Sequence, residues 1–243
     1  MISWLSRTEM LIGPEGILRM NSSDVLVVGL GGVGSWAAEM ICRAGVGKMT
    51  IVDGDTVHAT NRNRQLLALN STEGKPKAEV MAERLRDINP DLDLTVINEY
   101  IRDEKMIEVL DRGFSYVVDA IDTLSPKLFL LCHSVEKKIP VVSSMGSGGK
   151  FDPLNISISD ISETNSCPLA RILRKRLHRL GVRDGITAVY SPEPVDKSRV
   201  ERVEGERNKA SVVGTMPYMS AAFGIACASV VIRDLAGIPK WQT

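Results

Sequence analysis

The chain has 243 residues, of which 44% are hydrophobic and 25% charged, and this ordinary globular composition excludes a disordered, collagen-like or fibrous protein. Thirty basic residues balance thirty acidic ones, so no overall charge selects nucleic acid or a membrane surface. The four cysteines (Cys42, Cys132, Cys167 and Cys227) include no C-x-x-C pair, which argues against a zinc knuckle or a redox dithiol. Residues 1–10 lack an apolar signal-peptide core, and a reduced, cytoplasmic setting is therefore expected.

The first part of the chain alternates short apolar runs with segments of helical periodicity. The predicted strands are 24–28, 49–53, 92–97, 116–119 and 140–143, and the predicted helices are 34–44, 77–88, 106–110 and 126–137. Strands that alternate with helices indicate right-handed crossovers and a parallel sheet.

After residue 150 the pattern changes. Residues 155–159 alternate between polar and apolar side chains, which suits an antiparallel strand with one face in water. A helix over 168–180, a strand over 186–190 and a mobile loop or lid over 192–209 are expected to follow. The predicted fold is therefore an α/β Rossmann-like sheet, parallel in the first part with antiparallel strands added in the second, and with helices on both faces.

Residues 210–232 contain no charged side chain, a length that a membrane span would also have. Pro217 interrupts the stretch and suits the first position of a helix that runs to about Leu235. A buried helix is the favoured interpretation, and peripheral or C-terminal membrane association is the alternative.

A glycine-rich turn joins the first predicted strand to its helix and contains Gly29, Gly31, Gly32 and Gly34. Such glycines let backbone amides approach a phosphate that lies at the helix N-terminus. Asp53 ends the second strand, 19 residues after Gly34, where a carboxylate can bind a ribose. This placement predicts a nucleotide site; the alternative is a turn that only packs helix against strand.

Further polar residues help to decide whether the predicted site binds ATP or a dinucleotide. Asn61 and Arg64 come soon after the second strand, Lys77 opens the next helix, and Asp122 lies just past the fourth strand. The carboxyl ends of parallel strands border one crevice, so these side chains should converge near the glycine turn. The pyrophosphate of a dinucleotide needs fewer positively charged side chains than this segment supplies. The set suits a triphosphate whose terminal part leaves during the reaction.

Each of these residues also has a plain structural interpretation. Arg64 would form a surface ion pair, Lys77 would lie on the first turn of a helix, and Asp122 would cap the next segment. A cation at a helix start opposes the helix dipole, which favours a functional role for Lys77. Asp119, inside a predicted buried strand, is assigned no role.

Five segments together resemble the ThiF/MoeB/HesA superfamily of ubiquitin-activating-enzyme-like adenylyltransferases. They are RTEML from Arg7, GLGGVG, IVDGDTVHATNRNRQ, GKPKAE and VVDAIDT, and the resemblance runs from Arg7 to about Gly146. It implies a homodimer that binds ATP with Mg²⁺ and adenylates a carboxylate. A single domain over 1–243 is expected, with an ATP-binding part (1–150) and a part for substrate and dimer contacts (151–243).

The resemblance also implies roles by position. The implied ATP-binding residues are Gly29, Gly31, Gly32, Gly34, Asp53, Asp55, Asn61, Arg64, Lys77 and Asp122. Among them, Asp53 would lie at the ribose and Asp122 would bind or organise Mg²⁺. Arg7 would reach into the partner subunit's site. The implied catalytic residues are Arg7, Arg64, Lys77 and Asp122.

The second half distinguishes between branches of the superfamily. The segments CPLARILRKRLHRLGV, AVYSPEPV and SVVGTMPYMSAAFGIACASVVIRDLAG resemble the branch that dehydrates threonylcarbamoyladenosine in transfer RNA, by cyclisation through an acyl-adenylate. The sulfur-carrier branches have two C-x-x-C pairs for a structural zinc, and this chain has none. A cysteine desulfurase of a sulfur relay enters as a candidate partner through the resemblance alone.

The helix over 168–180 is a candidate RNA-binding element. Residues 166–183 hold six basic and no acidic side chains. The expected phosphate contacts are Arg171, Arg174, Lys175, Arg176 and Arg179, and the expected core-facing stripe is Leu169, Ile172, Leu173, Leu177 and Leu180. A basic stripe on a helix suits RNA phosphates. The alternative is a solvated helix face.

Three other functions stay open at this level. An adenylyltransferase could activate the C-terminal glycine of a ubiquitin-like sulfur carrier, an oxidoreductase could bind NAD at the same glycine turn, and a scaffold could sense nucleotide without catalysis. Cys167 heads a helix, where the pKa of a thiol can fall, so a reactive cysteine is a further alternative.

Overall fold

The structure is a computed structural model that describes residues 4–196, 198, 200–202 and 211–238. The helices are α1 (Ser6–Ser22), α2 (Gly34–Arg43), α3 (Lys77–Ile88), α4 (Asp103–Leu110), α5 (Leu124–Glu136), α6 (Pro168–Arg179) and α7 (Pro217–Ala236). The strands are β1 (Asp24–Val28), β2 (Lys48–Val52), β3 (Asp93–Ile97), β4 (Tyr116–Asp119), β5 (Val141–Ser144), β6 (Ser157–Asp160), β7 (Thr187–Tyr190), β8 (Val200–Arg202) and β9 (Ser211–Val213).

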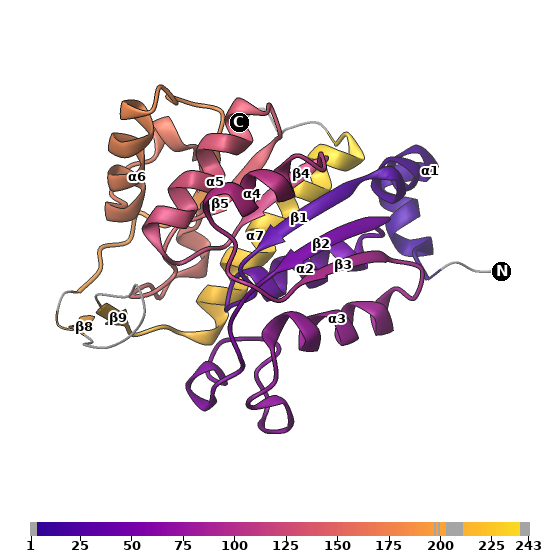
Figure 1. Cartoon of the computed structure of the whole chain (residues 1–243), viewed down its shortest axis with the longest axis horizontal. Coiled ribbons are helices and arrows are strands. Elements are labelled where there is room, and N and C mark those ends of the chain that lie inside the picture. The colour runs from indigo at the N-terminus through magenta and orange to yellow at the C-terminus, as the bar shows by residue number, and fades with distance from the viewer. Residues whose placement is uncertain (1–3, 197, 199, 203–210, 239–243) are drawn as a thin grey trace.

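Seven strands form one sheet in the order β3-β2-β1-β4-β5-β7-β6 (Figure 1). All neighbours are parallel except β6, which pairs antiparallel with β7. The central strands β1 and β4 are almost entirely buried apolar runs, as expected where helices cover both faces of a parallel sheet. The predicted Rossmann-like fold is confirmed, and β6 and β7 extend the same sheet.

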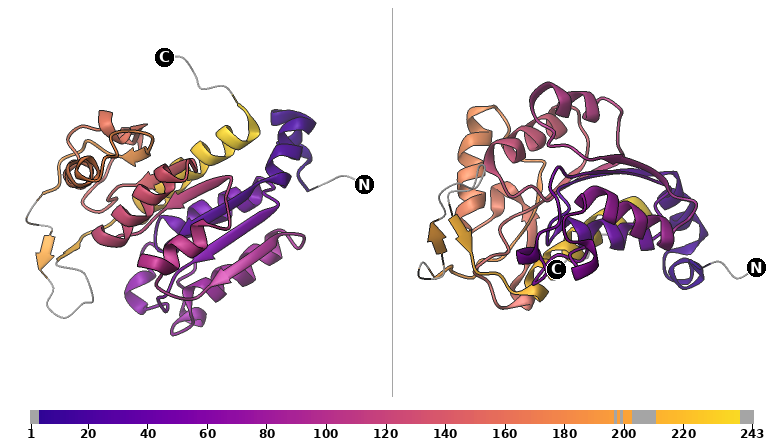
Figure 2. Two further views of the ribbon diagram at one scale, coloured as in Figure 1. Left: turned by 45° about the horizontal axis from the view of Figure 1, so that its top comes forward. Right: turned by 60° about the horizontal axis from the view of Figure 1, so that its bottom comes forward.

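Helices cover the sheet on both faces, as the right-hand view of Figure 2 shows. One hydrophobic core lies between the sheet and α2, α3 and α7. A second core lies on the opposite face, under α4, α5 and α6. The carboxyl ends of the parallel strands therefore lie between two rigid layers.

Helix α7 packs on α2, where Gly224 lies so close to Val33 and Trp36 that a side chain would overlap them. Phe223 and Cys227 are fully buried in the first core. Within the described residues, α7 is the one helix long and apolar enough to cross a membrane by length and composition. Its packing agrees with the predicted buried helix from Pro217.

Two parts of the chain differ from the expectations. Helix α1 had no counterpart among the predicted elements. It bends at Gly13, which has a φ of 72° and precedes Pro14. Within the expected loop 192–209, Val200–Arg202 instead forms β8, which pairs with β9. The expected loop also includes residues 197, 199 and 203–209, which lie outside the described residues.

Candidate active site

A cavity of about 680 Å³ lies at the carboxyl ends of the strands. It opens beside β1 and β4, neighbours in the sheet that are far apart in sequence, and this is the point where the strand order reverses. Open α/β sheets bind ligands at such a switch point. Its walls come from the glycine turn, the segments after β2, β4 and β5, and the start of α7.

The glycine turn contributes in two ways. Gly29 has a φ of +91° and lies so close to Ala120 that a Cβ would be 2.7 Å from its carbonyl oxygen. Gly34 is buried, and a Cβ there would overlap the carbonyl oxygen of Gly29. Gly31 and Gly32 line the cavity itself. Two glycines thus close the turn and two present bare backbone to a ligand, as a phosphate site requires.

Asp53 is fixed by two backbone amides. The N–H of Leu30 donates to Oδ2 at 2.7 Å and the N–H of Asp55 donates to Oδ1 at 2.8 Å. Burial raises the pKa of Asp53 above its ordinary value, while Lys77 and the two amides oppose that rise. Each carboxylate oxygen keeps a lone pair for a further donor, which suits the hydroxyl groups of a ribose.

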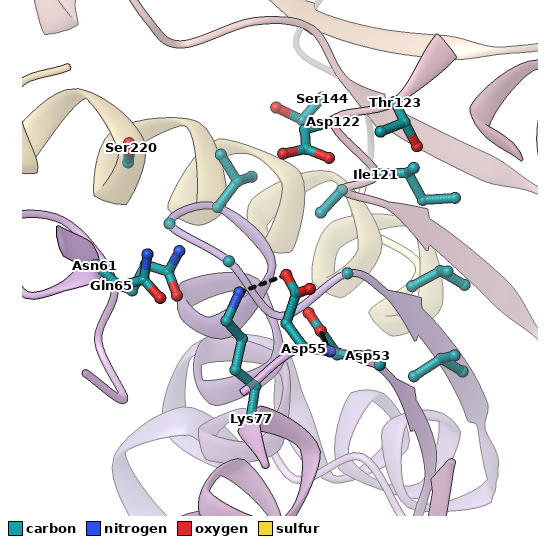
Figure 3. A pocket seen from close by; sticks show the side chains of 18 of the residues that line it. Asp53, Asp55, Asn61, Gln65, Lys77, Ile121, Asp122, Thr123, Ser144 and Ser220 are labelled. Atoms are coloured by element: carbon teal, nitrogen blue, oxygen red, sulfur yellow. Dashed lines mark hydrogen bonds and ion pairs between the residues drawn. The ribbon is translucent and has the colours of Figure 1, made fainter. Parts of the chain in front are cut away.

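Lys77 is the first residue of α3, and its side chain is only 6% exposed. Its Nζ lies 2.8 Å from Oδ2 of Asp55 (Figure 3). The hydroxyl of Tyr100 donates to the other oxygen of that carboxylate. Both Lys77 and Asp55 line the cavity. A cation is thus held inside the cavity at a helix start, where the backbone itself gives it no stabilisation.

The segment after β2 brings three more side chains to the cavity: Asn61, Arg64 and Gln65. Figure 3 shows the amide groups of Asn61 and Gln65 beside each other, near the end of the Lys77 side chain. Arg64 donates to Thr60 O at 3.1 Å and to Asn63 Oδ1 at 2.8 Å. Burial lowers the pKa of Arg64, and the nearby carboxylate of Asp122 opposes that effect.

Gln65 was not singled out from the sequence. It is 8% exposed, and its buried Oε1 has no hydrogen-bond partner among the described residues. The sequence offered little to identify Gln65, because a glutamine that follows an arginine belongs to no motif with a defined spacing. The buried amide that faces a cavity becomes visible only in the folded chain.

Asp122 lies on the loop after β4, across the crevice from Lys77 (Figure 3). Ser144 and Thr123 lie on the same side and also line the cavity. Among the described residues, no group of three or more His, Cys, Asp or Glu could hold a metal ion. A magnesium ion often uses only one or two carboxylates together with phosphates, so a single exposed carboxylate fits a nucleotide-bound Mg²⁺.

Asp119, assigned no role from the sequence, forms a buried network behind this loop. Its Oδ2 accepts from Ser143 Oγ at 2.7 Å and lies 2.7 Å from Lys127 Nζ. Lys127 is fully buried and was likewise missed. Asp119 lies buried at the end of β4 as expected, and its carboxylate also accepts a hydrogen bond from Ile121 on the loop that carries Asp122.

Arg7 is exposed on α1 and is not among the residues that line the cavity. Helix α1 leads into the amino end of β1, whereas the cavity lies at the carboxyl ends of the strands. The structure therefore does not bring Arg7 to the other candidate catalytic residues within the described part of one chain.

Helix α6 also lies apart from most of the cavity; of its residues, only Leu169 lines it. Arg171, Lys175, Arg176 and Arg179 are exposed. Arg174 instead donates to the carbonyl oxygens of Ile161, at 3.2 Å, and Thr164, at 2.7 Å. Its guanidinium is used to hold the turn before α6, so four of the five predicted phosphate contacts remain on the open face.

The predicted apolar stripe of α6 is only partly correct. Leu173 and Leu177 are buried, but Ile172 is 43% and Leu180 54% exposed. The buried side of α6 is therefore a narrow stripe of Ala170, Leu173 and Leu177, and the flanking apolar residues reach solvent.

Each of the four cysteines is a buried thiol. Burial raises the pKa of Cys42 to about 12 and that of Cys132 to about 11, which makes both poor nucleophiles. Cys167 stands at the N-cap of α6, is 8% exposed and is not among the cavity-lining residues.

Comparisons with known proteins agree with this geometry. The chain is 38% identical over 242 residues to the tRNA threonylcarbamoyladenosine dehydratase of Bacillus subtilis (strain 168), covering 97% of this chain and 95% of that protein. The structure of the Escherichia coli tRNA N6-threonylcarbamoyladenosine dehydratase TcdA in complex with ATP superimposes with a TM-score of 0.86 at 35% identity, covering 98% of this chain and 97% of that one. The molybdopterin-synthase adenylyltransferase of Salmonella typhimurium (strain LT2) is 37% identical over 129 residues, 53% of this chain and 51% of that protein. The model of the ThiF family matches residues 5–242, and the chain therefore belongs to the ThiF family.

Proposed function

We propose that the protein is an ATP-dependent dehydratase that cyclises threonylcarbamoyladenosine in transfer RNA through an acyl-adenylate. The observation that carries the proposal is the convergence of Lys77, Arg64 and Asp122 in one cavity at the glycine turn. Relatives that match nearly the full length of the chain have this activity in their names, and one of them is known in complex with ATP.

In the first step, the threonyl carboxylate of the modified nucleoside attacks the α-phosphorus of ATP, and pyrophosphate leaves. The nucleophile is already ionised, so no general base is needed. The barrier comes from bringing like charges together, and fixed cations and amide dipoles lower it most effectively. Lys77 and Arg64 supply the cations, and the backbone of Gly31 and Gly32 supplies the dipoles.

Asp53 would bind the ribose, since its carboxylate is oriented by Leu30 and Asp55 toward the cavity. Asp122 would hold Mg²⁺. When bound, the ion would neutralise charge on the phosphate oxygens and orient the pyrophosphate that leaves.

In the second step, an atom of the carbamoyl group attacks the activated acyl carbon and AMP leaves. The ring closes with loss of a proton from the carbamoyl group, and the oxygen of the lost water departs with AMP. Attack within one molecule has a high effective molarity, so positioning supplies much of the rate. Thr123, Ser144 and Ser147 also line the cavity and are available to position the acyl group.

We further propose that the enzyme is a homodimer in which Arg7 enters the partner's cavity. Helix α1 exposes apolar side chains, with Met10 87% and Leu11 85% exposed. A second copy of the chain would cover this face and bring a basic residue to the phosphates. The desulfurase partner and the cytoplasmic setting expected from the sequence stay predictions, as does the division into parts 1–150 and 151–243.

The transfer RNA would lie across the exposed basic face of α6. RNA helices are recognised largely through shape and phosphates, and the four open basic side chains suit that mode. Adenylation of a sulfur-carrier glycine is the second candidate, favoured by the partial likeness to a molybdopterin-synthase adenylyltransferase.

One experiment tests the proposal directly. The protein is incubated with ATP and transfer RNA that carries threonylcarbamoyladenosine, and the nucleosides are analysed by mass spectrometry. A product lighter by one water, formed together with AMP and pyrophosphate, is expected. Pyrophosphate release that requires a carrier protein instead of the RNA would support the second candidate and overturn the first.

A further inference from the structure

Asp119 and Lys127 form an ion pair that is completely buried behind the crevice. Asp119 ends β4, Lys127 lies near the start of α5, and their side chains are 0% and 1% exposed. Burying two opposite charges is costly, and an apolar pair of the same volume is often at least as stable. Stability alone does not account for this pair.

The pair acts on the backbone of Ile121. Asp119 Oδ1 accepts a hydrogen bond from the N–H of Ile121 at 3.1 Å, and Lys127 Nζ donates to the carbonyl oxygen of Ile121 at 3.1 Å. That carbonyl belongs to the peptide group joining Ile121 to Asp122. Both backbone polar atoms of the residue before Asp122 are therefore fixed by charged groups, and charge-assisted hydrogen bonds are the strong ones.

The clamp is separated from the ligand. Ile121 and Asp122 line the cavity, whereas Asp119 and Lys127 are not among the lining residues in the described part of the chain. The ammonium group of Lys127 thus acts through the loop and does not touch the contents of the cavity. We propose that Lys127, held by Asp119, is a positioning residue that fixes Asp122 at the phosphates during adenylation.

The inference rests on the proposed function, because it concerns the placement of Asp122 in that reaction. Asp122 stands on an exposed loop, and rotation of the peptide before it would move its carboxylate. A misplacement of about 1 Å at a reacting centre costs about 100-fold in rate. The buried charges would therefore be retained for geometry.

The test uses the double variant Asp119→Asn with Lys127→Met, which keeps both shapes and removes both charges. Hydrogen exchange, followed by mass spectrometry, should be faster in peptides that cover residues 120–124. The kcat for AMP formation on modified transfer RNA should fall about 10- to 100-fold, while the Kd for ATP changes less than about three-fold. In an Asp122→Asn background the same double variant should lower kcat no further, because the two changes act through one carboxylate.

Glu39→Gln is the matched control, since Glu39 is a buried carboxylate with two arginine partners on α2 and α3, outside the cavity. It should lower the Tm without changing exchange at 120–124 or kcat. If the double variant does not fold, Lys127→Arg, which keeps the charge but displaces the donor, is measured in the same way.

The positioning role is wrong if exchange at 120–124 and kcat both stay at the wild-type level. It is equally wrong if kcat falls by the same factor with and without the Asp122 carboxylate. Failure of the wild-type protein to form AMP on modified transfer RNA overturns the proposed function instead. In that case the exchange measurement still decides whether Lys127 holds the loop.

Discussion

The ammonium group of Lys77 lies 2.8 Å from a carboxylate oxygen of Asp55, inside the cavity that the triphosphate is proposed to enter. The pair holds the side chain of Lys77 in place, and Asp55 is itself bound by the hydroxyl of Tyr100. Incoming phosphates would compete with Asp55 for this cation. The pair thus prepares the cation for the step in which negative charge accumulates.

Lys77→Ala should lower the rate of pyrophosphate formation at saturating ATP about 100- to 1,000-fold, because a fixed cation at the transferring phosphate is removed. Rapid-quench measurement of pyrophosphate gives the rate. Lys75→Ala is the control, since Lys75 is exposed two residues earlier and is not among the cavity-lining residues. Equal rates for the two variants would remove Lys77 from the reaction.

Asp53→Ala should weaken ATP binding more than it slows the bound-state chemistry. Ribose contacts are similar in the ground and transition states, so their removal raises the Kd with little change in kcat. Titration calorimetry with ATP and steady-state kinetics separate the two quantities. An unchanged Kd with a large fall in kcat would contradict the ribose assignment.

The sequence predicted the parts of the site that local rules describe. The apolar runs ending in glycine or aspartate indicated where strands stop, and Lys77 stood out because a cation at the first position of a helix is unfavourable there. The same rule applies to Lys127 near the start of α5, yet its partner Asp119 lies on another element. That pairing depends on the packing of α5 against β4, which no local pattern specifies.

Tertiary contacts also explain what could not be predicted from the second half of the sequence. Arg174 looks like a surface cation in the sequence, but the turn at 161–164 folds back and presents two carbonyl oxygens to it. Ser220 lines the cavity because α7 returns to the glycine turn, where it lies close to Gly32. Such long-range approaches leave no periodic signal in the chain.

Arg7 should act across a subunit interface. An Arg7→Ala chain mixed with a Lys77→Ala chain should regain activity, because each heterodimer contains one site with both residues intact. Activity of the mixture is compared with that of each variant alone, after subunit exchange has been verified by native mass spectrometry. No gain in the exchanged sample would place Arg7 outside the reaction.

Glu39 predicts a pH dependence of stability. Burial alone would raise the pKa of Glu39, but hydrogen bonds from Arg84 and Arg43 outweigh it and lower the pKa below its ordinary value of 4.5. The folded state therefore holds this proton less tightly than the unfolded state. The stabilisation is present above pH 4.5 and is lost as the pH falls through the lowered value.

Glu39→Gln should accordingly cost about 1–2 kcal/mol of unfolding free energy at neutral pH, since the arginines are half exposed and partly screened. Urea unfolding at a series of pH values measures the difference. The two proteins should converge at acid pH. A difference in unfolding free energy that stays constant across the pH range would show that the arginines do not lower the pKa of Glu39 in the folded state.

The open face of α6 gives a prediction for RNA binding. Lys175 and Arg179 are exposed and lie one turn apart on the helix, so both can meet the same phosphate backbone. Their joint replacement by alanine should weaken transfer RNA binding whatever the sequence. The slope of log affinity against log salt should become shallower by about one unit for each phosphate that the variant no longer binds.

Arg174→Ala is the control for this measurement, because that side chain holds the turn at Ile161 and Thr164 and does not face the RNA in this arrangement. It should lower the Tm and leave the salt slope unchanged, whereas the double variant should change the slope and leave the Tm nearly unchanged. ATP affinity should be the same in all three proteins, since none of these basic residues is among those that line the cavity.

An unchanged slope in the double variant would mean that the α6 face is merely solvated and that the RNA docks elsewhere. A shallower slope in Arg174→Ala alone would mean that the guanidinium leaves its two carbonyl partners to bind phosphate.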